Sequence, residues 1–204
     1  MAETKKRRLS PEIRRAEILR AAAQSFRTHG LRGSTVDDIA FTAGVSVGLL
    51  YRFFASKTEI IQAIIAEDIE KQLAQTATLL AGAAQDPELL VRRLSSHLAE
   101  DQIDREHFAL QLEISAEVCR SPELRAFMRE KRLELIDALA KTLPEWGEST
   151  SAIKHILESL DLAGAAVSGL AIHAAIYSDL SHMRDELVPA VIRTIFTRKE
   201  NGPK

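Results

Sequence analysis

The sequence predicts an all-α protein of roughly nine helices, with a helix-turn-helix domain first and a helical bundle after it. Apolar residues recur at spacings of three and four along most of the chain, and no run alternates with period two for long enough to predict a sheet. Cap-then-proline pairs mark several helix starts. Hydrophobic residues make up 46% of the 204 residues, which is enough for the cores of one or two domains and excludes a disordered chain.

The first predicted helix begins after Ser10, an N-cap that is followed by a proline at the first helical position. Its inner stripe consists of apolar residues spaced four apart, Ile18, Ala22 and Phe26. We expect Gly30 to end this helix, because glycine adopts the left-handed conformation of a helix end at little cost.

Two short helices joined by a glycine turn are predicted between residues 35 and 57, and the rest of the chain is organised around them. Thr35 caps the first of them, with Asp38 returning the capping-box bond. Gly44 ends that helix, and Ser46 caps a second one that runs through Phe53. This arrangement is a helix-turn-helix.

The second short helix has an inner and an outer face. The residues that return to the first helix are Val45, Leu50 and Phe54. The residues that face outward are Val47, Leu49, Tyr51 and Arg52. A third helix starts with a capping box from Ser56 to Glu59, and its first-turn amides, together with Lys57, are suited to hold a DNA phosphate.

The block from about residue 14 to residue 65 resembles the DNA-binding domain of the TetR family of repressors. The family pattern runs I-L-x-x-A-x-x-x-F, then T-x-x-x-I-A-x-x-A-G-V-S, then G-x-L-Y-x-x-F-x-S-K. The matching residues are Ile18, Leu19, Ala22, Phe26, Gly30, Thr35, Ile39, Ala40, Ala43, Gly44, Val45, Ser46, Gly48, Leu50, Tyr51, Phe54, Ser56 and Lys57. Many matches at fixed spacings make the resemblance specific, whereas Ala-Gly-Val-Ser alone would be a weak signal.

The resemblance implies that the second short helix reads DNA. Val47 and Leu49 stand where many relatives carry polar or cationic residues, so they can contact a thymine methyl group but cannot form bidentate hydrogen bonds. We therefore expect Arg52 to read guanine. The residues expected to contact phosphates are Thr35, Thr42, Ser46, Tyr51 and Lys57, and Gly48 lets the backbone approach closely.

A basic run that includes Arg7 and Arg8 precedes the first helix. We favour an arm that lies along phosphates or enters the minor groove, because the DNA-binding motif follows at once. A solvated tail is the alternative.

Beyond residue 57 the pattern continues as helix upon helix. The predicted ranges are about 60–80, 86–101, 103–119, 121–143, 150–178 and 189–198. We expect residues 1–56 to form the DNA-binding domain, and residues 57–204 to form an effector-binding and dimerisation domain.

The last two predicted helices carry a candidate dimer surface. The residues expected in it are Leu157, Leu160, Gly164, Ser168, Ala171, Val191 and Ile195, which recur at helical spacing. The alternative is that the apolar faces of both helices are buried within the same chain. We favour a homodimer because two DNA-binding domains bound to a palindrome make enough contacts for the palindrome to be preferred over non-specific DNA. The TetR resemblance implies a four-helix bundle between the last two helices of each copy.

The predicted helices between residues 60 and 143 have more apolar surface than is needed to support a DNA-binding domain. The resemblance implies an effector pocket among these helices. An effector bound in it would move the two DNA-binding domains of a dimer apart and so weaken DNA binding by linkage. The candidate lining residues are His97, His107, Phe108, Trp146 and Tyr177. The sequence names no effector.

Charge and cysteine content suggest where the chain works and what it meets. Residues 1–57 carry a net charge of +6 in a chain whose total is −2, so only the amino-terminal part is suited to a polyanion. The single cysteine, Cys119, excludes an internal disulfide framework. No apolar stretch is long enough to span a bilayer, and the basic start lacks a secretion signal, so we expect a cytoplasmic protein without membrane contact.

Two other chemistries are conceivable. Gly44 to Gly48 matches the G-x-S-x-G nucleophile elbow of hydrolases, but an elbow needs a strand before its serine, and none is predicted. Carboxylate and histidine pairs at helical spacing offer a metal site, yet the Glu-x-x-His pattern of bundle metal sites is missing. We therefore expect no enzyme, cofactor or metal, and predict a ligand-released repressor that binds a palindromic operator. The alternatives are a DNA-binding protein without a ligand switch and an all-α metal protein or enzyme.

Overall fold

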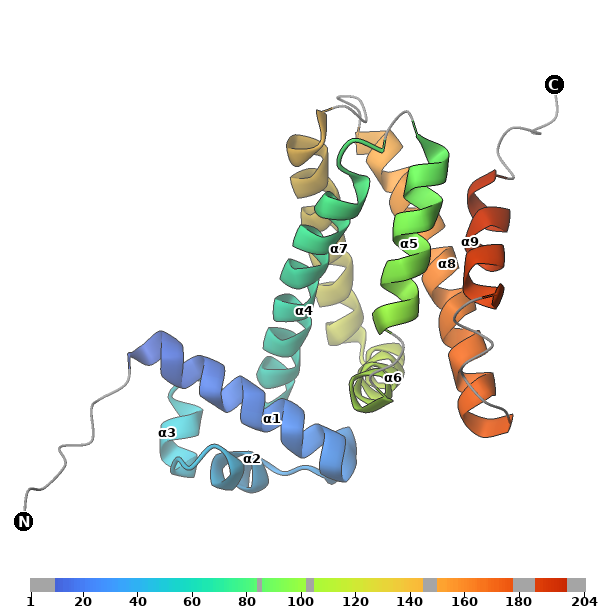
Figure 1. The fold of residues 1–204 in the computed structure, drawn as a ribbon. Coiled ribbons are helices and arrows are strands. Elements are labelled where there is room, and N and C mark those ends of the chain that lie inside the picture. Colours follow the sequence, from blue (N-terminus) through green and yellow to red (C-terminus); the bar gives the residue numbers. More distant parts are fainter. Residues whose placement is uncertain (1–9, 84–85, 102–104, 145–149, 178–185, 198–204) are drawn as a thin grey trace, which may run out of the picture. The chain divides into compact units, whose positions relative to one another are not determined.

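The computed structural model describes residues 10–83, 86–101, 105–144, 150–177 and 186–197. Within these ranges the protein is all-α and has nine helices, as predicted (Figure 1). They are α1 (Pro11–Gly33), α2 (Val36–Thr42), α3 (Val47–Tyr51), α4 (Lys57–Leu80), α5 (Pro87–Asp101), α6 (Arg105–Arg120), α7 (Pro122–Thr142), α8 (Thr150–Tyr177) and α9 (Val188–Thr197).

The cap-then-proline signals are confirmed at three helix starts. Ser10 Oγ accepts a hydrogen bond from the Ile13 amide at 3.3 Å, and Ser121 Oγ accepts one from the Leu124 amide at 3.2 Å. The Asp86 carboxylate accepts the Leu89 amide at 2.9 Å. Each side chain satisfies a first-turn donor that has no partner inside its helix.

Contacts divide the chain into two compact units, which we describe separately. The first unit comprises Met1–Glu67 and Ala109–Met128, and the second comprises Asp68–Phe108 and Arg129–Lys204. This differs from the division at residue 57 that we expected, because the first unit takes in the start of α4 and most of α6. The assignment of separate functions to residues 1–56 and 57–204 stays a prediction.

The first unit is built around α1, against which α2 packs (Figure 1). The predicted stripe is confirmed, because Ile18, Ala22 and Phe26 are all buried. Regular helix breaks at Gly30, which has φ 75°, before a last turn that ends at Gly33. Glycine is required here because L residues rarely adopt positive φ.

In the second unit α9 packs against both α5 and α8 (Figure 1). A single cluster of buried residues forms the core of this unit. Its members are Leu80, Ala83, Leu90, Val91, Leu94, Leu135, Leu139, Leu143, Ile153, Leu157, Ala163, Val188 and Ile192. Helices α4, α5, α7, α8 and α9 all contribute, so the predicted helical bundle is confirmed for this unit.

Candidate nucleic-acid interface and ligand cavity

Helices α2 and α3 form the predicted helix-turn-helix. Thr35 Oγ1 accepts the Asp38 amide at 3.1 Å, and the Asp38 carboxylate accepts the Thr35 amide at 2.8 Å, which completes the capping box. These bonds from Thr35 hold the pKa of Asp38 below its ordinary value. Gly44 has φ 64° and turns the chain toward Ser46, whose hydroxyl accepts the Leu49 amide at 3.1 Å. Local hydrogen bonds therefore define both helix starts.

Helix α3 is short, and it presents one face to solvent. It ends at Tyr51 with Arg52 as its cap, so the expected continuation through Phe53 is absent. Leu50 is fully buried, whereas Gly48, Tyr51 and Arg52 are exposed. The side chains of Val47 and Leu49 are only partly exposed. The described face is thus a guanidinium and a phenol beside two apolar side chains.

Lys57 lies at the start of α4, but its ammonium group is directed into the first unit. Nζ donates to the carbonyl oxygens of Leu31 and Ser34, the latter at 2.7 Å, and lies 5.8 Å from the centre of the Phe26 ring. Burial lowers the pKa of Lys57, and the Glu117 carboxylate partly offsets this effect. The phosphate contact that we expected of Lys57 stays a prediction, and it competes with these bonds.

Glu113 of α6 also bonds to the segment that follows Gly30, which Lys57 contacts. Its carboxylate accepts the Leu31 amide and lies 3.3 Å from the position that a Cβ atom at Gly30 would occupy. Inside the turn, Ser25 donates to Ser34 at 3.0 Å, and Ser34 donates to the Gly30 carbonyl at 3.0 Å. We call the segment Gly30–Ser34 the α1 turn. It leads directly into α2, so its bonds position the helix-turn-helix.

Replacement of Glu113 by alanine is expected to destabilise the first unit by about 1–2 kcal/mol, because it leaves the buried Leu31 amide without its acceptor. Glu113→Gln keeps a carbonyl acceptor of the same length and is the matched control. Urea unfolding followed by circular dichroism measures both variants. Equal midpoints for Glu113→Ala and the parent protein would show that water replaces the carboxylate.

Sequence reasoning missed Phe41 on α2, which is 89% exposed. A signal was present, because Ile39 and Ala40 already supply the buried face of this short helix. Phe41, the next residue along the helix, must then point away from this buried face. Thr42, beside it, is exposed, and its predicted phosphate contact stays a prediction. Arg7 and Arg8 lie outside the described residues.

Comparison with known proteins bears on this site. Residues 18–64, which contain the helix-turn-helix, match the family model described as bacterial regulatory proteins, tetR family. The HTH-type transcriptional regulator UidR of Escherichia coli (strain K12) is 31% identical over 129 residues, 63% of this chain and 64% of UidR. The HTH-type transcriptional regulator BetI of Burkholderia mallei (strain NCTC 10229) is 28% identical over 161 residues, 76% of this chain and 83% of BetI. Residues 18–64 of this chain therefore match the TetR family, and the chain is similar over a longer stretch to HTH-type transcriptional regulators.

The likeness to a solved structure covers the second unit as well as the first. The solved structure of Salmonella enterica GusR superposes with a TM-score of 0.66 at 26% identity, covering 93% of this chain and 96% of GusR. The likeness therefore extends far beyond the residues that match the family model. The chain matches just under two thirds of the length of UidR, at 64%.

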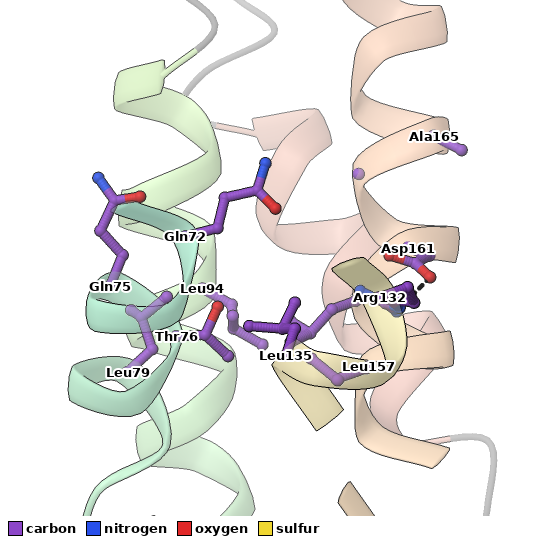
Figure 2. A pocket seen from close by; sticks show the side chains of 12 residues that line it. Gln72, Gln75, Thr76, Leu79, Leu94, Arg132, Leu135, Leu157, Asp161 and Ala165 are labelled. Carbon is purple, nitrogen blue, oxygen red and sulfur yellow. Dashed lines mark hydrogen bonds and ion pairs between the residues drawn. The ribbon is translucent and has the colours of Figure 1, made fainter. Parts of the chain in front are cut away.

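The second unit contains a cavity of about 320 Å³ among α4, α5, α7 and α8 (Figure 2). The residues that line it are Gln72, Gln75, Thr76, Leu79, Leu94, Arg132, Leu135, Leu157, Leu160, Asp161, Gly164 and Ala165. Arg132 of α7 donates to the Asp161 carboxylate of α8. Burial raises the pKa of the Asp161 carboxyl, while Arg132 acts in the opposite direction.

None of the expected effector-pocket residues is among those that line this cavity. His97, His107, Phe108 and Tyr177 have side chains outside the described part of the structure, and Trp146 lies outside the described residues altogether. The lining instead consists of leucines, amides and one ion pair. No aromatic signal in the sequence could have found it, because leucines on four helices meet only in the folded protein.

The structure corrects part of the predicted dimer surface. Leu157 belongs to the core of the second unit, and Leu160 and Ile195 pack against that core, so these residues are used within the chain. Gly164 lines the cavity. Ser168 and Val191 are partly exposed, and the side chain of Ala171 is not described. Leu157 and Leu160 therefore lie on the inner face of α8, and other apolar residues of the same helix are exposed. The role of the predicted residues in a dimer stays a prediction.

The two alternative chemistries gain no support from the described residues. Ser46 follows helix α2 and caps α3, so the strand that a nucleophile elbow requires is replaced by a helix. In the described residues no group of three or more His, Cys, Asp and Glu side chains is placed to hold a metal ion. Among the described residues, no helix is both long enough and apolar enough to cross a membrane.

Proposed function

We propose that this protein is a transcriptional regulator that binds a palindromic DNA operator as a homodimer, represses transcription there, and is released by a small molecule. The observation that carries the proposal is the capped pair α2–α3 around Gly44, whose second helix presents Arg52 and Tyr51 to solvent. A short exposed helix after a tight turn has the geometry that other helix-turn-helix proteins insert into the major groove.

The charge distribution supports DNA as the partner of this surface. Residues 1–57 carry a net charge of +6, although the whole chain carries −2. Positive side chains that neutralise phosphates release counterions from DNA, and this release raises the affinity for DNA. Thr42, Ser46 and Tyr51 are exposed on the helix-turn-helix, where they can donate to phosphates without leaving the core.

The exposed side of α8 supports a homodimer. Leu162, Ala165, Gly169 and Ile172 are all exposed and recur at spacings of three and four, and we call these four residues the outer stripe. Leu162 is 59% exposed and Ile172 is 37% exposed, so the outer stripe is a row of exposed apolar residues of the kind that marks an interaction surface. Ala165 and Gly169 allow another helix backbone to approach closely. A second copy packed on the outer stripe replaces the dimer surface that we first expected.

The cavity of the second unit supports release by a ligand. It is large enough for a small molecule, and its walls come from four helices that such a molecule would hold together. A ligand weakens DNA binding only if it prefers the conformation whose two heads do not fit the operator. The proposal therefore requires that cavity ligands and operator DNA lower each other's affinity.

Selection of bound sequences from a random duplex library tests the proposal directly. Purified full-length protein at a stated salt concentration is expected to enrich a palindrome with two equivalent half-sites. Enrichment of no sequence, with binding that falls steeply with salt, would identify an architectural protein that reads only phosphates. The half-buried Val47 and Leu49 make that outcome the one to watch, because neither can form a hydrogen bond to a base.

Replacement of Arg52 by alanine is expected to cost about 1–3 kcal/mol of operator binding and to relax the preference at one base pair of each half-site. Arg52 is the exposed guanidinium at the end of α3. Repeating the library selection with Arg52→Ala measures both effects, and Arg20→Ala, at an exposed arginine of α1, is the control. A uniform loss of affinity for all sequences would assign Arg52 to phosphate contact.

A further inference from the structure

The cavity of the second unit has a composition that points to one class of ligand. This inference rests on the proposed function, in which the cavity is the effector site. Its floor consists of Leu94, Leu135 and Leu157, each at most 4% exposed. Gln75 and Thr76 of α4 lie on one side of this floor, and Arg132 and Asp161 lie on the other (Figure 2). A ligand must therefore satisfy an apolar floor and two different polar walls.

The charges that line the cavity are already paired with each other. Arg132 and Asp161 are the charged residues of the lining, and Arg132 donates to the Asp161 carboxylate. A ligand carboxylate would compete with Asp161 for the guanidinium group, and a ligand ammonium would compete with Arg132 for the carboxylate. The Arg132 side chain is 32% exposed and that of Asp161 is 63% exposed, so either ion gains one charge pair only by breaking the pair that already exists. An uncharged ligand leaves the Arg132–Asp161 pair intact.

The neutral polar groups on the opposite wall are the ones that can accept a new partner. Within the described residues, the side chains of Gln75 and Thr76 form no hydrogen bond, whereas Gln72 donates to Asp68 at 3.1 Å. An amide and a hydroxyl group can both donate and accept. A ligand hydroxyl or amide group matches this wall without any change in charge.

We propose that the cavity binds an uncharged molecule that has an apolar body and at least one hydroxyl or amide group. The apolar body lies on Leu94, Leu135 and Leu157, and the polar group bonds to Thr76 and Gln75. The volume of about 320 Å³ limits the ligand to a small molecule. Burial of the apolar body supplies most of the affinity, and the hydrogen bonds supply the selectivity.

A matched series of probes tests this proposal on the full-length protein. Phenylbutanol, phenylbutanamide, phenylbutanoate and phenylbutylammonium share one apolar body and differ in the polar group. Calorimetric titration near neutral pH is expected to show binding of the alcohol and the amide, with the two ions weaker by at least about tenfold. Equal or tighter binding of either ion would overturn the proposal, and so would the absence of binding by all four probes.

Three variants locate the binding site. Thr76→Val removes the hydroxyl at constant shape and is expected to weaken phenylbutanol binding about fivefold to tenfold. Thr78→Val is the matched control, because the Thr78 hydroxyl donates to the Ala74 carbonyl and does not line the cavity. Gly164→Leu should abolish binding, because a Cβ atom there meets nothing within 4 Å and the added side chain fills the cavity. Binding that survives Gly164→Leu places the ligand elsewhere and refutes the proposal.

The two hypotheses fail in different experiments. Selection of DNA by the unliganded protein tests the regulator, and the probe series tests the cavity. Phenylbutanol binding without any selected operator would contradict the proposed function but support the proposed ligand class. A selected operator without probe binding would support the DNA-binding regulator but contradict the proposed ligand class.

Discussion

A Leu162→Glu protein is expected to be monomeric and to bind the selected palindrome on the order of a thousandfold more weakly than the parent protein. Leu162 is 59% exposed and is the first residue of the outer stripe of α8, so a carboxylate there leaves the core of the second unit unchanged. In a dimer the same carboxylate would be buried against an apolar partner without a counter-ion, which is costly. Analytical ultracentrifugation measures the mass, and fluorescence anisotropy measures the affinity.

Leu133→Glu is the matched control for this experiment. Leu133 lies on α7 and is 68% exposed, so both substitutions place a carboxylate at an exposed leucine of the second unit. Only the α8 substitution is expected to change the mass and the affinity. If Leu162→Glu stays dimeric while Leu133→Glu becomes monomeric, the partner surface lies on α7 and not on the outer stripe.

A Lys57→Met protein is expected to lose about 2–3 kcal/mol of stability in the first unit, because two buried carbonyl groups lose a charged donor. Methionine keeps the apolar length of the side chain, so packing against Phe26 is retained. Operator binding should weaken in proportion to the fraction of molecules whose α1 turn is disordered. Thermal unfolding of the free protein measures the first effect, and anisotropy at two temperatures measures the second.

Two roles for Lys57 can be separated by the same variant. If the ammonium instead contacts a phosphate, as the sequence predicts, Lys57→Met should leave the unfolding temperature unchanged and reduce the salt dependence of DNA binding by about one counter-ion. Lys71→Met, at an exposed lysine on the same helix α4, controls for the loss of one positive charge.

The helix starts and the glycine turn could be predicted because their causes lie close together in the sequence. Thr35 bonds to a group three residues away, and so do Ser10, Ser46 and Ser121. Positive φ at Gly44 and Gly30 follows from the residue type together with its position at a helix end. The family pattern combines these signals, which is why the residues of the helix-turn-helix could be located correctly from their order and spacing.

The faces of the later helices could not be predicted in this way. Two stripes of α8 repeat at spacings of three and four, and both contain small and apolar residues. Periodicity shows that a helix has an inner face, but it does not show which of two similar stripes is inside. The core around Leu139 and Ile153 selected the stripe that contains Leu157, and the stripe that contains Leu162 was left exposed.

The sequence by itself determined the all-α class, the approximate positions of the nine described helices and the helix-turn-helix, because caps, prolines and glycines act on their neighbours. Only the tertiary structure decided that Lys57 bonds to the carbonyl of Leu31, 26 residues away, and that Glu113 of α6 accepts the amide of the same residue, 82 positions away. It also brought leucines of four helices and one ion pair together around a cavity. Such contacts depend on how distant helices pack, and packing is chosen by the whole core and by no local signal.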